Sequence, residues 1–516
     1  MPEDGRIARR NRPPGSDAQI DGCGRCHARR GTLGDYHYGA DLLDTHRLTM
    51  PRPPAYHVDG QIRDEVYVYG SFVQSRMHLA GVVCSNCHEP HSLQLRAPGN
   101  GVCTQCHAPS HYDSEQHHHH AAQSAGAQCA ACHMPETTYM QVDPRRDHSM
   151  RIPRPDLSQV IGTPNACTQC HADQKADWAA RALREWGISF DDTARHPARA
   201  LHRLEQGDNR AVPRLAQLAG DTGAAPIWRA TAMEALGEVG GREAMQAATS
   251  MLYHDDPLLR ASSVRALQFL SPAQRFQLLQ ALVDDPVTTV RMEVALALAG
   301  VPLAQVQPEQ AARLKALFEE YLAIQRRHAD MPGALLQTGY FHAARGEPAA
   351  AEKAYREAIR LNRQLIPAYI NLADLLRSES RDGEARELLL KALDIAPEHG
   401  PTLHVLGLLE TRSGNPEAAL DYLGRAAGVE SSGIRHRFVY AIALHDLGKP
   451  QEAIAQLRSL LRTVPQNEDV LLALANYHAE LGRREAAAGY ARTLTQVAPG
   501  NRAYRALYER LSAGGR

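Results

Sequence analysis

The sequence predicts a mostly α-helical protein, in which a loop-rich N-terminal domain precedes an all-α solenoid. Three observations indicate this fold class. All ten cysteines lie in five C-x-x-C-H motifs before residue 175. A period of about 30 residues follows between residues 195 and 305, and a period of 34 residues runs from Ala351 toward the C-terminus. We therefore predict three domains, at residues 1–175, 195–305 and 308–516.

The first domain is defined by its five C-x-x-C-H motifs, the signature of c-type haem attachment. Both thiols of such a motif bond to the haem, and the imidazole that follows them ligates the iron. Zinc ribbons also use C-x-x-C pairs but need no histidine directly afterwards. The sequence therefore predicts haem c as the cofactor, at five sites. The attachment cysteines are Cys23, Cys26, Cys84, Cys87, Cys103, Cys106, Cys129, Cys132, Cys167 and Cys170, and the iron ligands are His27, His88, His107, His133 and His171.

Each iron also needs a second axial ligand, and the first domain holds eleven further histidines. His91 lies three residues after His88, so a short tether could present it to a neighbouring haem. His148 follows Asp147, which could orient the ring as carboxylates do for metal-bound imidazoles. A run of four histidines lies between two motifs, and at most two of its rings can point at one iron. We expect distal ligands among His91, His148, His117, His118, His119 and His120.

Local order in the first domain is expected to be limited. Hydrophobic periodicity is weak there, so we predict short helices around the motifs, packed on the haems, and a strand or hairpin near residues 64–72. This sets the first domain apart from the rest of the chain.

The second domain is predicted to consist of HEAT-like helical repeats. Pro226, Pro257 and Pro286 each precede an Ala-Leu pair at the same offset, and Asp-Asp comes directly before the last two prolines. Proline in the first turn after an Asp cap is a typical helix start. Helical pairs with this period stack by burying one face against the next unit.

The third domain is predicted to be a tetratricopeptide array. Alanines recur every 34 residues, the length of that repeat, and glycines recur at the turns between helices. We expect a helix at about 308–328 before the array and a closing helix at 500–512. The alanines are Ala351, Ala385, Ala419, Ala453 and Ala487, and the glycines are Gly346, Gly414, Gly448 and Gly482. Histidines after residue 175 are expected to face solvent or take part in hydrogen bonds.

Six segments of the first domain resemble periplasmic multihaem cytochromes c of the cytochrome c-554 type, in the group that is fused to tetratricopeptide repeats. The segments are EVYVYGSFVQSRM (65–77), CSNCHEPH (84–91), HHHH (117–120), CAACHMPETTYM (129–140), RRDHSMRIPRPDLS (145–158) and GTPNACTQCH (162–171). The resemblance implies iron ligation by the motif histidines and a distal role for His148 and the 117–120 run. Relatives carry an export signal and further motifs upstream, so we expect a periplasmic or otherwise exported protein whose true start is missing here.

The expected function is electron transfer through bis-His haems, with the solenoid docking a partner. Fourteen residues between His88 and Cys103, and twenty-one between His107 and Cys129, would hold neighbouring haems close together. One alternative is a multihaem oxidoreductase of small nitrogen or sulfur compounds, with Arg145, Arg146, Arg151 and Tyr139 as candidate proton donors. A second alternative is a repeat scaffold with an incomplete haem domain. We assign no catalytic residue.

Composition limits the classes of partner that the chain is expected to bind. The net charge is −1, which gives no argument for nucleic acid. No stretch approaches the roughly 18 consecutive apolar residues of a membrane span. The expected partner is a redox protein that docks on the haem domain or on the tetratricopeptide surface.

Overall fold

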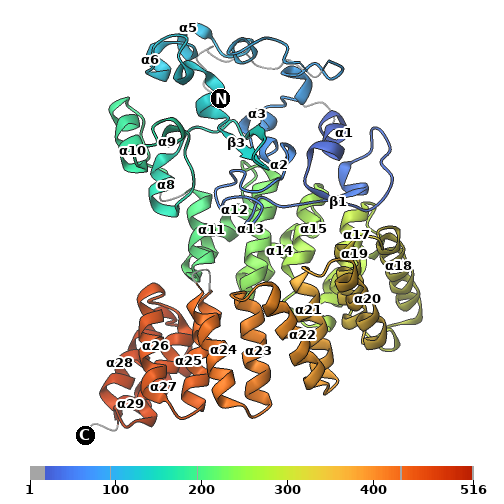
Figure 1. Cartoon of the computed structure of the whole chain (residues 1–516), viewed down its shortest axis with the longest axis vertical. Coiled ribbons are helices and arrows are strands. Elements are labelled where there is room, and N and C mark those ends of the chain that lie inside the picture. Colours follow the sequence, from blue (N-terminus) through green and yellow to red (C-terminus); the bar gives the residue numbers. More distant parts are fainter. Residues whose placement is uncertain (1–17, 93, 194–195, 430–432, 514–516) are drawn as a thin grey trace. The chain divides into compact units, whose positions relative to one another are not determined.

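The structure, a computed structural model, describes residues 18–92, 94–193, 196–429 and 433–513 (Figure 1). Residues 1–17 of the first predicted domain, and 514–516 of the third, lie outside the described residues. Helices dominate, so the mostly α-helical fold class is confirmed. Contacts between Cα atoms divide the chain into two compact units, described separately below. The first comprises 1–202, 211–298 and 308–317, and the second comprises 203–210, 299–307 and 318–516.

The N-terminal region is built from short helices and two hairpins. Its helices have four to ten residues, below the roughly 12–15 that make an isolated helix stable in water, so tertiary contacts must hold them. β1 pairs antiparallel with β2, and β3 with β4. The elements are α1 (Ala18–His27), β1 (Arg30–Thr32), β2 (His46–Leu48), α2 (Tyr69–Phe72), α3 (Arg76–Leu79), α4 (Gly101–Thr104), α5 (Pro109–Tyr112), α6 (Glu115–His118), α7 (Cys129–His133), β3 (Glu136–Tyr139), β4 (Asp143–Arg146), α8 (Pro155–Ile161), α9 (Ala166–Cys170) and α10 (Ala176–Glu185).

The strand or hairpin expected near residues 64–72 is not formed. The segment instead ends in helix α2. Tyr67 has a φ of 60°, which takes the chain out of an extended path. Gly70 packs so closely on Tyr56 that a Cβ there would collide with the Tyr56 hydroxyl. Close packing therefore overrides the strand propensity of the aromatic and β-branched residues.

The middle segment, in the first unit, consists of paired helices. α13 begins at Pro226 and α15 at Pro257, as predicted, and the Asp256 carboxylate accepts a hydrogen bond from the Leu258 amide at 2.8 Å. α17 begins at Thr288, two residues after Pro286. The helices are α11 (Pro197–Glu205), α12 (Val212–Gly220), α13 (Pro226–Val239), α14 (Gly241–Met251), α15 (Pro257–Ala266), α16 (Pro272–Leu279) and α17 (Thr288–Leu298).

The N-terminal region and the middle segment share one hydrophobic core. Ile20, Leu42 and Phe72 from the N-terminal region belong to the same buried cluster as Ile227 and Leu259. Polar contacts join the same parts. The Thr289 hydroxyl donates to the His46 carbonyl at 3.0 Å, and Arg47 pairs with the buried Glu293 at 2.9 Å. The helical repeats therefore form one wall of the N-terminal region's core.

The C-terminal segment is an array of antiparallel helix pairs with the predicted phase. The five alanines at 34-residue spacing are all fully buried, because each packs where two helices approach most closely. The four turn glycines have φ between 71° and 79°, the left-handed region that glycine adopts most easily. The helices are α18 (Pro308–Arg327), α19 (Pro332–Ala344), α20 (Pro348–Leu361), α21 (Ile366–Ser378), α22 (Asp382–Ile395), α23 (Gly400–Arg412), α24 (Pro416–Gly428), α25 (Ile434–Asp446), α26 (Pro450–Thr463), α27 (Glu468–Glu480), α28 (Arg484–Val497) and α29 (Arg502–Ser512).

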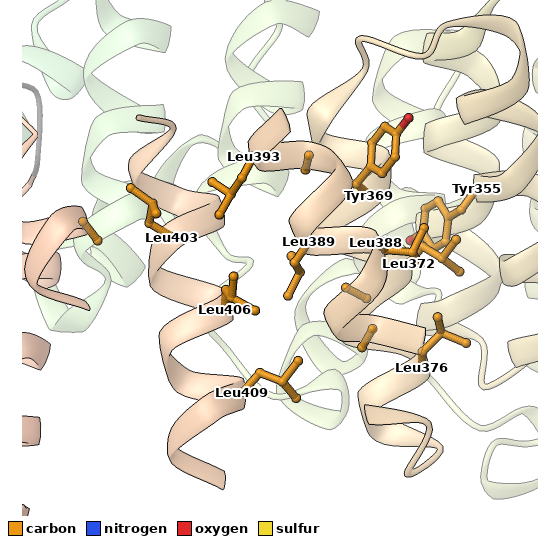
Figure 2. Packing of buried hydrophobic residues seen from close by; sticks show 14 of the residues in the cluster. Tyr355, Tyr369, Leu372, Leu376, Leu388, Leu389, Leu393, Leu403, Leu406 and Leu409 are labelled. Atoms are coloured by element: carbon orange, nitrogen blue, oxygen red, sulfur yellow. The ribbon is translucent and has the colours of Figure 1, made fainter. Parts of the chain in front are cut away.

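Leucines fill the interior of this array. Figure 2 shows Leu389 between Leu372 on one side and Leu406 on the other, and all three are fully buried. α18 and α29 match the helices expected before and after the repeats. The third segment is therefore a regular solenoid of helical hairpins.

Candidate functional site

Three motif histidines lie next to a second histidine from elsewhere in the N-terminal region. The ring centres are 6.3 Å apart for His88 and His148, 6.2 Å for His133 and His117, and 6.3 Å for His171 and His120. The first two pairs have nearly parallel planes, at 23° and 14°. These separations are too large for direct ring stacking. The sequence thus named six residues that the fold brings together in pairs.

Hydrogen bonds orient one ring in two of these pairs. The Nδ1 atoms of His133 and His148 lie 2.9 Å from the carbonyl oxygens of Arg151 and Arg146. A neutral ring that donates its Nδ1 proton to a carbonyl keeps an unprotonated Nε2, which can act as a hydrogen-bond acceptor or a ligand. Burial lowers the pKa of His148, and the nearby His88 lowers it further. Burial and His88 outweigh the hydrogen bond to the Arg146 carbonyl, which raises the pKa, so the neutral imidazole of His148 is favoured at pH 7.

The remaining predicted histidines are not paired in this way. Within the described part of the chain, neither His27 nor His107 has another imidazole at the distance seen in the three pairs. His91 is exposed. His119 stacks on Trp186 at 4.1 Å, and the Nδ1 of His118 accepts a hydrogen bond from the His120 amide at 3.2 Å. The four rings of the run 117–120 therefore make different contacts.

Thiols of different motifs lie against one another. Burial, and then the neighbouring Cys23, raises the pKa of Cys84 to about 12. A hydrogen bond from the Cys103 thiol lowers the pKa of Cys129 and raises that of Cys103. Burial raises the pKa of Cys132 to about 11. Thiols with raised pKa stay protonated and weakly nucleophilic at neutral pH, so Cys129 is the most activated thiol of these four.

The prediction of haem c at five sites is contradicted. In residues 18–92, 94–193, 196–429 and 433–513, no group of three or more His, Cys, Asp or Glu side chains is placed to hold a metal ion. The imidazoles lie in pairs instead. In these ranges, only three of the five motif histidines are paired with a second histidine. Electron transfer through five bis-His haems therefore loses its support.

Three of the four candidate proton donors, the arginines, form ion pairs. Arg151 pairs with the buried Asp59 at 3.3 Å, Arg145 with Asp143 at 2.6 Å, and Arg146 with Glu136 at 3.3 Å. Tyr139 is buried, and burial raises its pKa to about 12. These side chains brace the β3–β4 hairpin and its surroundings. The Tyr139 hydroxyl has no hydrogen-bond partner among the described residues.

Two tryptophans that lie beside the histidines were not predicted from the sequence as part of the site. Trp178 lies 4.8 Å from His171, and Trp186 packs on His119. Both follow the last motif, outside the boundary drawn at residue 175. Their position could have indicated this, because they lie on and just after α10, the first amphipathic helix after the motifs.

The array presents a recurring face on the first helix of each repeat. Two positions per repeat, four residues apart and therefore on one side of the helix, carry mainly apolar side chains. Tyr340 is 50% exposed and Leu408 is 43% exposed. We call this set the first-helix stripe. It comprises Leu336, Tyr340, Ile370, Asp374, His404, Leu408, Phe438, Ile442, Leu472 and Asn476.

Comparison with protein families identifies both repeat types. Residues 223–299 match the model of HEAT repeats. Residues 342–399, 404–468 and 444–511 match models of the tetratricopeptide repeat. None of the described helices has the length and apolar character that crossing a bilayer requires.

Individual proteins match over parts of the chain. Anaphase-promoting complex subunit 3 of Schizosaccharomyces pombe is 25% identical over 152 residues, which are 29% of this chain and 22% of that protein. Among solved structures, YrrB, described as a TPR protein with an unusual peptide-binding site, has a TM-score of 0.30 at 20% identity and covers 36% of this chain and 95% of its own. Pseudomonas aeruginosa pilF has a TM-score of 0.30 at 20% identity over 44% of this chain and 99% of its own. The matches to the family models, by contrast, show HEAT repeats at 223–299 followed by tetratricopeptide repeats at 342–511.

Proposed function

We propose that this chain is a docking scaffold that holds a protein partner on its tetratricopeptide array. The observation that carries the proposal is the first-helix stripe. Large apolar side chains recur there at the repeat period, and two of them, Tyr340 and Leu408, stay about half exposed. Stacked helical repeats use such extended surfaces for binding. Exposed apolar side chains that recur in one line are typical of an interaction site.

Photo-crosslinking in the full-length protein tests this function. A photoreactive amino acid replaces Tyr340 or Leu408 on the stripe, and in control variants it replaces Leu361 or Ile395. These controls are similarly exposed, at 37% and 38%, but end the second helices of their repeats. We expect the stripe positions to capture one protein, whose binding is then measured with purified material. Equal capture at all four positions, or capture at none, would rule the scaffold function out.

The motif residues remain a second, separate proposal. We propose that the ten cysteines and the paired histidines form one functional cluster of the N-terminal region, in which Cys129 is more reactive than Cys84, Cys103 and Cys132. The regular motif spacing, the three imidazole pairs and the contacts between thiols support this. Export from the cytoplasm likewise stays a prediction.

Alkylation of the folded protein tests the motif proposal. The purified protein is treated briefly with iodoacetamide without denaturant, and peptide mass spectrometry locates the alkylated cysteines. We expect Cys129 to react before Cys84, Cys103 and Cys132, because the pKa of those three thiols is raised. Equal rates at all four cysteines would contradict the proposal.

A further inference from the structure

Two histidines of neighbouring repeats lie together on the array. His404, on α23 and in the first-helix stripe, and His436, on α25, have ring centres 4.8 Å apart with planes at 31°. His436 also packs on the start of α23, where a Cβ added to Gly400 would lie 3.4 Å from its Nδ1. The two rings therefore bridge the first helices of consecutive repeats.

Both rings carry a buried nitrogen without a partner. His404 is only 7% exposed, and the Nδ1 atoms of His404 and His436 are enclosed with no hydrogen bond to the described residues. A buried N–H without an acceptor is unfavourable, so the proton is favoured on Nε2 in each ring. Each Nε2–H then has no acceptor among the described residues and can donate to a bound ligand.

The electrostatic surroundings of these rings are positive. Burial, and then the neighbouring His436 and Arg435, lower the pKa of His404 to about 4. Burial also lowers the pKa of His436, as do Arg435 and His399. Among the described residues, Arg435 is the permanent cation that acts on both rings. Arg435 is exposed and has no ion pair among the described residues.

We propose that His404, His436 and Arg435 form a subsite for a side-chain carboxylate of an acidic protein segment. Two N–H donors and one guanidinium match the two oxygens and the charge of such a group. Leu408, one turn after His404, contacts an apolar side chain of the same segment, since it is 43% exposed on the same face. This inference rests on the scaffold function proposed above and names the chemistry of its partner.

Fluorescence anisotropy with the full-length protein tests the subsite. The probe is a labelled synthetic peptide that alternates Glu and Leu and ends in an amide, so that all its carboxylates are side chains. Matched peptides carry Gln or Lys in place of Glu. We expect the Glu peptide to bind at least about tenfold more tightly than either, a typical effect of one charged hot spot. Equal binding of the Glu and Lys peptides would overturn the proposal.

Variants locate the effect. Arg435→Glu should weaken binding of the Glu peptide at least about tenfold. Arg502→Glu is the matched control, because Arg502 is also an exposed arginine at the start of a helix, α29, and should change nothing. His436→Leu should weaken binding while its circular dichroism melting curve stays that of the parent. Equal effects of the two arginine variants would also overturn the subsite.

The crosslinking experiment separates the two proposals. If the stripe captures a partner but the Glu peptide shows no preference, this subsite is wrong and the scaffold function stands. If neither occurs, both are wrong.

Discussion

The N-terminal region and the tetratricopeptide array place their residues by different means. In the array, one alanine recurs every 34 residues and is fully buried each time, so a single rule fixes the position of every helix. In the N-terminal region the elements are short, and the sequence that carries the chemistry has little periodicity. His88 and His148 meet although sixty residues separate them in sequence. A periodic sequence thus predicts where each helix lies. A motif such as C-x-x-C-H predicts which residues carry the chemistry, but it does not predict which side chains they will contact.

The largest expected effect comes from opening the array's core. Leu389→Ala should lower the free energy of unfolding by about 2–5 kcal/mol, because Leu389 is fully buried and leaves a cavity. Circular dichroism follows loss of helix during urea unfolding. The three tryptophans, Trp178, Trp186 and Trp228, all precede the array, so their fluorescence should report a transition that does not move. Ile395→Ala, at a 38% exposed position, is the control and should cost far less.

Hydrogen exchange should separate the two regions next. Amides of α5, α6 and α7 should exchange at least about 100-fold faster than those of α23 and α24, because very short helices open locally at low cost. Mass spectrometry of peptides from both regions measures this. Similar protection in both regions would contradict the difference in local stability between them. It would mean that further contacts order the N-terminal region.

Acid should weaken the N-terminal unit through His46. Burial, Arg30 and Arg25 lower its pKa to about 4, below the roughly 6.5 of an unfolded chain. The unfolded state therefore binds the proton first, so the stability from neutral His46 is complete above about pH 6.5 and falls toward pH 4. Between about pH 7.5 and 5.5 the loss should be about 1 kcal/mol. Tryptophan fluorescence during urea unfolding measures it.

His46→Gln should flatten this pH dependence, since glutamine does not titrate. His37→Gln, at an exposed position, should leave the slope unchanged. Identical slopes for His46→Gln and the parent would show that another group is responsible.

The smallest effect concerns one irregular turn in the array. Ser380 stands where the other repeats have glycine, and its φ is 63°. A non-glycine residue in this region costs roughly 1–2 kcal/mol, partly offset by the larger entropy that glycine loses on folding. Ser380→Gly should therefore stabilise the array by about 0.5–1 kcal/mol in thermal unfolding followed by circular dichroism. Ser378→Gly, at the last residue of α21, should instead destabilise it by up to about 1 kcal/mol.

The repeats could be predicted because their signals are local and repeated. Proline and aspartate start α15, and glycine closes four turns of the array. The burial of His404 and His478 was missed, as both were expected to face solvent or to form hydrogen bonds. The 34-residue repeat could have indicated this burial, because equivalent positions carry apolar residues. His404 is equivalent to Ile370 and Phe438. His478 is equivalent to Leu376 and Leu444. Alignment of the chain with itself would have placed both in the array's interior or along its stripe.

The N-terminal site could be predicted only in part. The motif residues, His148 and the run 117–120 were named, and three pairs formed among them. Which rings pair depends on loops whose paths are set by contacts distant in sequence, such as Asp147 accepting from the Ile62 amide at 3.4 Å. The role of Trp186 depends on the fold returning α10 to the histidine run.

The buried cluster that joins Ile20 and Phe72 to Ile227 and Leu259 has a practical consequence for protein production. A fragment ending near residue 175 would lose the helices that cover these side chains and would expose a hydrophobic surface to solvent. Such a fragment should precipitate or recruit chaperones, whereas one extended through Leu298 keeps the cluster closed.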